Sequence, residues 1–406
     1  MKNKYTPEIR FPGFIGEWEQ RKLGEISEKV TEKNKNNIYT ETLTNSAEFG
    51  IINQRDFFDK DISNEKNLDG YYIVGPDDFV YNPRISNLAP VGPINRNKLG
   101  RTGVMSPLYY VFRTHDVEKT FLEKYFSSNS WHIFMKLNGD SGARSDRFAI
   151  KDTLFREMPI PFPSIEEQTK IGNFFKQLEG TIALYQQELI TLKKTKQGFL
   201  QKMFPKEGES APEIRFPGFT EDWEKQKLGD LLEERNEQMP ENEEYQLMSF
   251  TATEGVTPKS DRYNREFLVK SDNKKYKKTE KGDLIYSSNN LDVGSIGLNN
   301  MGNAVISPVY SIFYVKDGIT SDFIGMMIQR KEFIKKMLRF RQGVVYGQWR
   351  IHETDFLNIG ALIPSSPEQR KIGKFFKQLD ETISLRQREL DSLKETKKAF
   401  LQKMFA

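Results

Sequence analysis

Two long stretches of the chain carry apolar side chains at alternating steps of four and three residues. A period of 3.5 residues kept along a whole stretch is typical of a coiled coil rather than of one face of a globular helix. The pattern therefore predicts two long helices with one seam each. The first seam consists of Ile171, Phe175, Leu178, Ile182, Tyr185, Leu189, Leu192, Lys196, Phe199 and Met203. The second seam consists of Ile372, Phe376, Leu379, Ile383, Arg386, Leu390, Leu393, Lys397, Phe400 and Met404.

Signals for helix ends flank both seams. Ser164 stands three residues before Glu167, and Ser365 stands three residues before Glu368, a spacing that predicts a capping box at each helix start. Pro205 is expected to end the first helix. A helix of about 40 residues is roughly 60 Å long, and an apolar stripe of that length needs a partner. The other stripe is the obvious partner.

The direction in which the two helices pair is left open by the heptads. A pseudo-two-fold molecule favours an antiparallel pair, because that arrangement places one globular domain at each end. Lys196 and Lys397 occupy equivalent polar positions in the two seams. We expect these lysines to fix the register of the pair at some cost in stability.

The chain is a tandem duplication. Residues 6–25 and 211–230 are identical at 13 of 20 positions, and residues 167–205 and 368–406 are identical at 26 of 39. Between these blocks only an outline persists, including strand-like runs at Phe79–Tyr81 and Leu284–Tyr286. The sequence predicts an α+β protein with pseudo-two-fold symmetry, built from two globular domains and two long helices in an intramolecular antiparallel coiled coil. The expected boundaries are 1–163, 164–205, 206–364 and 365–406.

Composition narrows the class of protein. Thirty Phe, sixteen Tyr and four Trp are enough to build real cores, and a disordered chain would be poor in them. The absence of cysteine excludes disulfides and thiolate metal sites, which fits a reducing cytosol. We expect neither a signal peptide nor a membrane span, and therefore a cytoplasmic protein. A net charge of +4 is only a weak hint of a polyanionic partner, since charge alone favours an ordinary mixed-charge surface.

Catalytic motifs are missing from the sequence. No phosphate-binding GxxxxGK[ST] loop occurs, and the chain has only three histidines, so we expect no nucleotide, zinc or other metal site. The run Asn82-Pro83-Arg84-Ile85 approaches the Asn/Asp-Pro-Pro-aromatic motif of amino-methyltransferases but lacks its second proline and its aromatic residue. We therefore expect a protein that is not an enzyme and that holds no cofactor itself.

Two repeated motifs point to a known family. Phe11-Pro12-Gly13-Phe14 followed by Trp18-Glu19 stands at the head of the first half and recurs in the second. An EQxKIGxFF entry into a long helix follows the proline-rich run 159–163 and also recurs. This duplicated frame resembles the specificity subunits of type I restriction–modification enzymes, and the resemblance spans the whole chain.

The resemblance implies a non-catalytic, DNA-binding role. Two target-recognition domains would each read one half of a bipartite, asymmetric sequence in double-stranded DNA, and the coiled coil would set the gap between the halves. The helices would also dock two methyltransferase subunits, which use S-adenosylmethionine. Motor-nuclease subunits would use ATP and Mg²⁺.

DNA-contacting residues are expected in polar turns between strand-like runs, because base edges are read by amide, hydroxyl and guanidinium groups. The run 274–278 is rich in lysine and is expected to contact phosphates. Candidates in the first domain are Asn82, Arg84, Ser86, Asn87, Arg96, Arg101, Arg144, Ser145 and Arg147. Candidates in the second are Lys274, Lys275, Lys277, Lys278, Asn289, Asn290, Tyr346, Gln348 and Arg350.

Two other interpretations stay open at this point. The chain could be a coiled-coil adaptor that does not bind DNA, or a fused methyltransferase that acts alone. Salt-dependent binding to one duplex over others would exclude the first. Methylation of DNA by the purified chain alone would establish the second.

Overall fold

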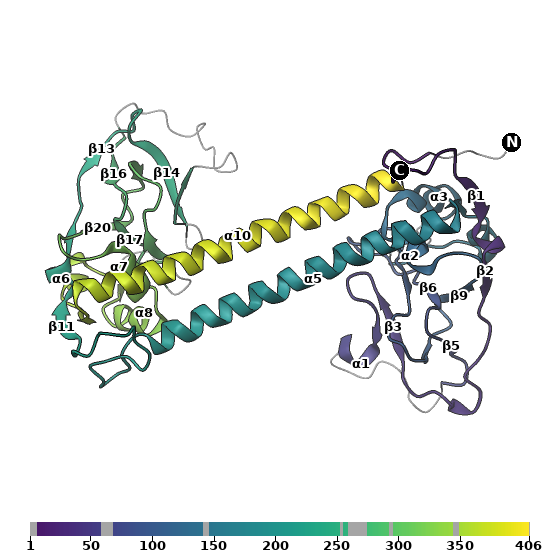
Figure 1. Cartoon of the computed structure of the whole chain (residues 1–406), viewed down its shortest axis with the longest axis horizontal. Coiled ribbons are helices and arrows are strands. Elements are labelled where there is room, and N and C mark those ends of the chain that lie inside the picture. Colours follow the sequence, from purple (N-terminus) through teal and green to yellow (C-terminus); the bar gives the residue numbers. More distant parts are fainter. Residues whose placement is uncertain are drawn as a thin grey trace. The chain divides into compact units, whose positions relative to one another are not determined.

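The computed structural model divides into two compact units, each described here by itself (Figure 1). It describes residues 6–57, 68–140, 146–251, 255–258, 274–291, 295–343 and 349–405. Unit 1 comprises residues 1–186 and 388–406, and unit 2 comprises residues 187–387. Each unit therefore combines the globular part of one half with a segment of both long helices, α5 (Ile165–Lys202) and α10 (Ser366–Met404).

Unit 1 is built on an antiparallel sheet of four strands in the order β2-β9-β6-β7. Strand pairs β1–β10, β3–β4 and β5–β8 accompany it. The strands are β1 (Glu19–Lys22), β2 (Ser27–Lys29), β3 (Leu43–Ser46), β4 (Gly50–Asn53), β5 (Tyr72–Val74), β6 (Phe79–Tyr81), β7 (Ile94–Arg96), β8 (Gly103–Met105), β9 (Tyr110–Thr114) and β10 (Pro159–Phe162). The helices besides the long ones are η1 (Leu23–Glu25), η2 (Lys35–Asn37), α1 (Gln54–Phe57), α2 (Lys119–Ser127), α3 (Ser130–Asn138) and α4 (Asp152–Arg156).

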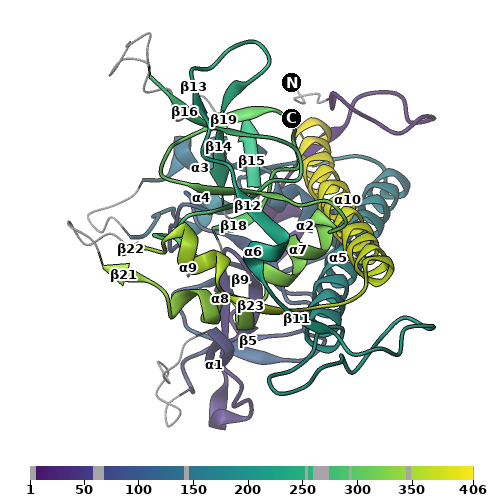
Figure 2. The same ribbon diagram turned by 90° about the vertical axis from the view of Figure 1, so that its left-hand side faces the viewer.

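Unit 2 repeats this plan with the equivalent sheet β12-β20-β17-β18 and a five-stranded sheet β13-β16-β19-β14-β15 (Figure 2). Its strands are β11 (Glu224–Lys227), β12 (Leu232–Glu234), β13 (Gln238–Met239), β14 (Gln246–Thr251), β15 (Gly255–Pro258), β16 (Tyr276–Thr279), β17 (Leu284–Tyr286), β18 (Ile296–Leu298), β19 (Ala304–Ile306), β20 (Ser311–Val315), β21 (Gln342–Gly343), β22 (Trp349–Arg350) and β23 (Gly360–Ile363). Its shorter helices are α6 (Leu228–Leu231), α7 (Ser321–Ile328), α8 (Lys331–Leu338) and α9 (Glu353–Leu357). The α+β class and both predicted strands, now β6 and β17, are confirmed.

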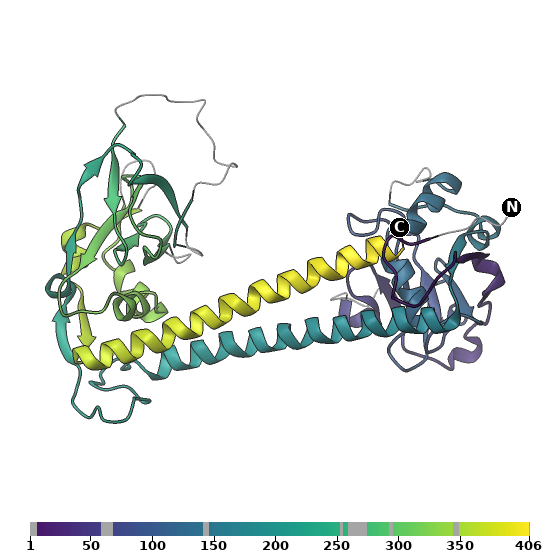
Figure 3. The ribbon, with the colours of Figure 1, turned by 45° about the horizontal axis from the view of Figure 1, so that its top comes forward.

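The long helices pack antiparallel within each unit, as Figure 3 shows. In unit 1 the rings of Phe174 and Phe400 lie 5.0 Å apart, and the Lys397 ammonium lies 2.7 Å from the Glu179 carboxylate. From the first of these contacts to the second, the residue number rises along α5 and falls along α10, so the two helices run antiparallel. In unit 2 the equivalent contact joins Phe199 of α5 and Phe375 of α10, whose rings lie 5.1 Å apart.

All twenty predicted seam residues are buried or half-buried, while most positions between them are exposed. The two seam lysines pair with equivalent acids of the opposite helix. Lys196 forms an ion pair with Asp380 in unit 2, just as Lys397 pairs with Glu179 in unit 1. Each half-buried ammonium thus lies against an equivalent carboxylate of the opposite helix, which favours this register over a shifted one.

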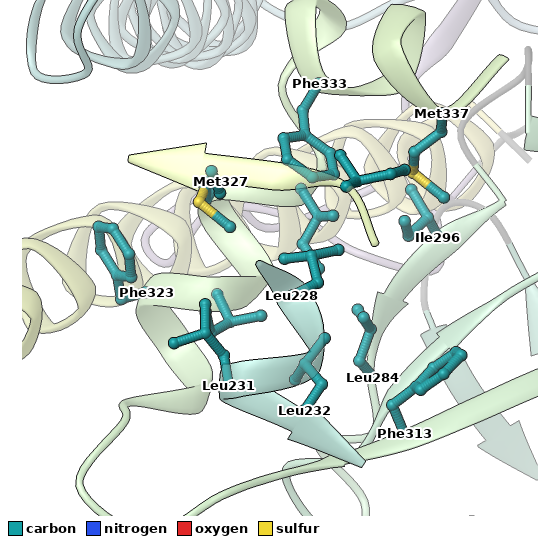
Figure 4. Close-up of a cluster of buried hydrophobic side chains, with 14 of the residues drawn as sticks. Leu228, Leu231, Leu232, Leu284, Ile296, Phe313, Phe323, Met327, Phe333 and Met337 are labelled. Atoms are coloured by element: carbon teal, nitrogen blue, oxygen red, sulfur yellow. The ribbon is translucent and has the colours of Figure 1, made fainter. Parts of the chain in front are cut away.

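Apolar side chains of the central sheet and of the helices on it form the core of each unit. Figure 4 shows part of the unit 2 core, to which Leu284 and Phe313 of the sheet and Phe323 and Met327 of α7 all belong. In unit 1 the rings of Phe79 and Phe112, which are cross-strand neighbours, stack 5.5 Å apart. Burial of such large rings dominates core energetics, so the two sheets are rigid supports for the loops at their edges.

The predicted capping boxes are wrong in one respect. At α5 the Ser164 hydroxyl accepts the backbone N–H of Glu167, as expected. The Glu167 carboxylate instead accepts two hydrogen bonds from the Arg10 guanidinium, at 2.6 and 2.7 Å, and one from the Trp18 indole. Glu368 holds Arg215 in the same way in unit 2. The repeated arginine and glutamate therefore fasten the head of each half to a long helix.

Candidate nucleic-acid interface

Unit 1 carries a groove of about 630 Å³ beside the ends of β3 and β6. Four of the predicted DNA contacts, Asn82, Arg84, Ser86 and Arg147, line it together with Asn45. Residues about 60 positions apart meet here, because Arg84 and Arg147 face each other across an isolated antiparallel bridge. The groove thus presents guanidinium, amide and hydroxyl groups on one surface.

The arginines and the amides of the groove differ in their contacts with the rest of the chain. Arg84 is 63% exposed, and its nearest carboxylate among the described residues is that of Asp146, at 3.9 Å. By contrast, the Asn82 side-chain amide donates to the Asn45 carbonyl at 2.8 Å, and the Asn45 amide donates to the Val80 carbonyl at 2.7 Å. The amides shape the wall, the Arg84 guanidinium is largely exposed, and Arg147 is half-buried.

An apolar side chain forms part of the rim of this groove. Leu108 is 58% exposed and follows Pro107 in the tight turn between β8 and β9. Val309 stands at the equivalent turn of unit 2 and is 73% exposed. Apolar contacts of this kind suit the methyl group of thymine. Neither Leu108 nor Val309 was predicted from the sequence, although both follow a Ser-Pro pair that the two halves share.

Arg96 and Arg101 were predicted to contact DNA, but the structure holds both in ion pairs. The Arg96 guanidinium lies 2.6 Å from the Glu123 carboxylate, and Arg101 forms two hydrogen bonds of 2.7 Å with Glu41. Neither residue lines the groove. Asn87 is exposed in the turn after β6 and does not line the groove either.

Arg96 belongs to a buried charge cluster around Glu123. Burial raises the pKa of this carboxyl, but the ammonium groups of Lys124 and Lys98 outweigh burial and lower the pKa to about 2. Lys124 also pairs with Glu179 of α5 at 2.7 Å. The cluster therefore ties α2 and the edge strand β7 to a long helix, which is a structural role.

Unit 2 brings together a different set of side chains at the corresponding place. The Asn289 side-chain oxygen accepts the backbone N–H of Trp349 at 2.7 Å, and the Arg341 guanidinium lies over the Trp349 ring at 5.4 Å. Arg350 is 54% exposed and only 3.4 Å from Glu353. Asn290 is exposed in the same turn. Trp349 itself is 47% exposed, so an aromatic ring and the Arg350 side chain face solvent next to an amide.

The lysine run of unit 2 is not the continuous phosphate-binding patch that the sequence predicts. Strand β16 alternates its side chains, so Lys277 points inward, is 7% exposed and donates to the Tyr310 carbonyl. Lys278 is held by Glu280 at 3.0 Å and Glu237 at 3.4 Å, which raises its pKa. Lys274 and Lys275 are exposed, and their contact with phosphates stays a prediction.

Four further candidates, Arg144, Ser145, Tyr346 and Gln348, lie outside the described residues. Among the described residues, no group of three or more His, Asp or Glu side chains is placed to hold a metal ion. In the same part of the chain, no helix combines the length and the apolar character that crossing a membrane requires.

Two units with the same sheet order and differently equipped loops define a duplicated nucleic-acid recognition protein. The chain belongs to the family described as the type I restriction modification DNA specificity domain, whose model matches residues 15–194 and 220–395. The double match coincides with the two halves of the tandem repeat.

Curated relatives include two specificity subunits of type I restriction enzymes from Methanocaldococcus jannaschii. The MjaX subunit is 24% identical over 274 residues, which are 62% of this chain and 60% of that protein. The MjaVIII subunit is 22% identical over 267 residues, or 61% of each chain. The match thus spans about 60% of the length of these relatives.

Solved structures agree with the fold. The S subunit of a type I restriction–modification system from M. genitalium has a TM-score of 0.59 at 14% identity, with 99% of both chains covered. The HsdS subunit from Thermoanaerobacter tengcongensis has a TM-score of 0.50 at 16% identity, covering 99% of this chain and 98% of that one. At these identities the similarity shows the arrangement of the elements and does not identify the residues that contact DNA.

Proposed function

We propose that this chain is the DNA-recognition subunit of a type I restriction–modification enzyme and that each unit reads one half of a bipartite, asymmetric target. The observation that carries the proposal is the contrast between the two loop surfaces on one repeated frame. Unit 1 offers Arg84 and Arg147 beside hydroxyl and amide groups. Unit 2 offers Asn289, Trp349 and Arg350. Two equivalent sheets that carry different polar side chains in their loops suit the recognition of two different half-sites.

The chemistry on these surfaces fits base reading in the major groove. Guanidinium groups pair with guanine, amides pair with adenine, and apolar tips meet the thymine methyl group. Arg84, Asn289 and Leu108 supply one exposed example of each class. Both surfaces stand at the edges of rigid sheets, which limits the entropy lost on binding.

The partners follow from family membership and remain part of the proposal. Two methyltransferase subunits would dock on the exposed faces of α5 and α10, where Leu184, Ile190 and Leu385 are 59%, 47% and 49% exposed. Those subunits would hold S-adenosylmethionine, and motor-nuclease subunits would hold ATP and Mg²⁺. We assign no catalytic step to this chain.

Selection from a randomised duplex pool tests this proposal. The full-length chain, alone and with its methyltransferase subunits, would be incubated with duplexes whose two variable windows are separated by gaps of different length. We expect enrichment of two short defined sequences at one fixed gap. Enrichment of no sequence would contradict DNA recognition, and methylation by the chain alone would replace it with the fused-enzyme interpretation.

Assigning the groove of unit 1 requires a variant with a matched control. Changing Arg84 and Arg147 to Ala removes both guanidinium groups that line the groove, and we expect specificity to fall at one half-site by about 1–3 kcal/mol per lost base contact. The control changes Lys35 and Lys136, two exposed lysines of unit 1 outside the groove. It removes the same charge and should leave sequence preference intact.

A further inference from the structure

Helix α8 of unit 2 presents a face rich in cations. The twelve residues 330–341 include six Lys or Arg and one Glu. Arg330 packs over the Phe204 ring at 4.5 Å and is not part of this face. The cationic face consists of Lys331, Lys335, Lys336 and Arg339, all exposed. Within the described part of the chain none of these four side chains forms an ion pair, so their charge is directed to solvent.

The spacing of the four cations places them on one side of the helix. The exposed Glu332 lies on the same side, and its carboxylate lies 3.7 Å from Arg330. Positions i, i+4, i+5 and i+8 lie close together on an α-helix, while Phe333 and Met337 occupy the opposite, buried side. Like charges so close together repel one another, which costs stability in the free protein. A polyanion that lies along the face would relieve this repulsion.

The equivalent helix of unit 1, α3, lacks this face. Trp131 and Met135 are buried there just as Phe333 and Met337 are buried in α8, which fixes the correspondence of the two helices. Ile133 and Leu137 then occupy the places of Lys335 and Arg339, at 66% and 79% exposure. Residues 129–140 carry one Lys and one Asp. The repeated frame therefore has a cationic helix in only one of its two units.

The cationic face leads directly into the residues that unit 2 offers to bases. Three residues beyond the end of α8, the Arg341 guanidinium donates to the Ser288 carbonyl at 2.7 and 3.1 Å and lies over Trp349. Gln342 donates to Asp355 of α9, and Figure 2 shows α8 and α9 with the β21–β22 pair. Phosphate contacts beside base contacts are the usual composition of a protein–DNA interface.

We propose that the face formed by Lys331, Lys335, Lys336 and Arg339 binds the phosphate backbone of the DNA duplex and that unit 2 supplies most of the sequence-independent affinity of this chain. The inference rests on the proposed function and extends it. Both units read bases, and unit 2 in addition holds a duplex of any sequence through its phosphates. Lys274 and Lys275 add to the same unit.

Salt titration tests this inference with a duplex of arbitrary sequence as the probe. Each lost phosphate contact lowers the slope of log K against log salt by about 0.9. Changing the four cations of the face to Gln should therefore reduce that slope by about 2–4 and weaken binding at least about tenfold at low salt, alike for all sequences. A slope that stays within one unit of the wild-type value would overturn the inference.

The matched control removes the same charge elsewhere in unit 2. Lys193, Lys194, Arg370 and Lys374 are exposed on the long helices, and their change to Gln should leave the slope unaltered. An equal loss in both variants would mean that net charge, not this face, governs binding, which also overturns the inference. If the wild-type chain shows no salt-dependent binding at all, the proposed function itself fails.

A second experiment adds cations to unit 1 instead of removing them from unit 2. Changing Ile133 to Lys and Leu137 to Arg gives α3 the cations that α8 has at the corresponding positions. Both side chains are largely exposed, so the fold should tolerate the change. We expect the salt slope to steepen by about 1–2. No change in slope would show that this helix position does not face the duplex.

Discussion

Glu167 shows at the scale of single residues why the two repeated motifs occur together. Its carboxylate is 1% exposed and accepts hydrogen bonds from Arg10 and from the Trp18 indole, residues that belong to the other motif. The next residue, Gln168, accepts the Glu118 backbone N–H and donates to the Pro163 carbonyl. A carboxylate followed by an amide thus joins the head segment, helix α2 and the start of α5.

Removing one partner of this ion pair tests its contribution. Changing Glu167 to Gln leaves the Arg10 guanidinium, only 17% exposed, without its counter-charge. We expect a loss of about 2–4 kcal/mol in the free energy of unfolding, measured by urea denaturation of the transition that unit 1 undergoes. The neighbouring exposed Glu166 changed to Gln is the control and should cost less than about 0.5 kcal/mol. Equal midpoints for both variants would contradict this role.

Glu123 predicts how stability depends on pH. Its pKa of about 2 in the folded chain lies below the ordinary value of 4.5, so its stabilising effect is complete above pH 4.5 and is lost as the pH falls toward 2. The full effect is at most about 3 kcal/mol. Between pH 6 and pH 3, the wild-type chain should therefore lose more unfolding free energy than the Glu123→Gln variant. If the unfolding free energies of the two proteins changed in parallel with pH, the stabilising contacts of the Glu123 carboxylate would be contradicted.

Local periodicity determines how much of the molecule could be predicted from the sequence. The seams, both long helices and strands β6 and β17 follow from patterns within each segment. The partner of a side chain does not: Arg101 is neutralised by Glu41, which is 60 positions away, and Glu167 by Arg10, which is 157 positions away. Lys277 was misjudged because the inward face of β16 depends on which strands pair with it.

At the scale of elements, α5 and α10 carry the connection between the two halves, since each belongs partly to unit 1 and partly to unit 2. The seam lysines and their acids, Asp380 and Glu179, repeat at equivalent positions in the two units. This repetition makes the register of the helix pair the same on both sides. A change in helix length that preserves the heptads should therefore preserve the pairing.

Insertion of one heptad into each long helix tests whether the helices set the gap between half-sites. Seven residues placed after Gln186 and after Gln387 keep the seam and add about 10 Å, the length of roughly three base pairs. We expect the preferred gap, read by selection from the randomised pool, to lengthen. Insertion into α5 alone is the control, because it shifts the register and should weaken recognition altogether. An unchanged gap with both insertions would show that something else sets it.

At the scale of the whole molecule, one frame is used twice with different surfaces. The groove of unit 1 holds Arg84 and Arg147, whereas unit 2 has Asn289 and an exposed Trp349 beside a cationic helix. The near-identical blocks are the head segments and the long helices, and both surfaces lie in the divergent residues between them. A duplicated gene that keeps its supports and varies its readers can acquire new targets one half at a time.

Variants in one unit should therefore alter one half of the target only. We expect Arg84→Ala with Arg147→Ala to relax the base preference of one half-site and Asn289→Ala with Arg350→Ala to relax that of the other. The two sets act as controls for each other, and the selected sequences provide the measurement. Relaxation of the same half-site by both sets would mean that the two surfaces do not read separate halves.

Genome-wide mapping of methylated adenine, in cells with and without this gene but with the methyltransferase subunits present, tests the central claim most directly. The account predicts one bipartite methylated motif with a fixed gap that disappears when the gene is deleted and returns when it is restored. An identical set of methylated adenines in both strains would contradict it.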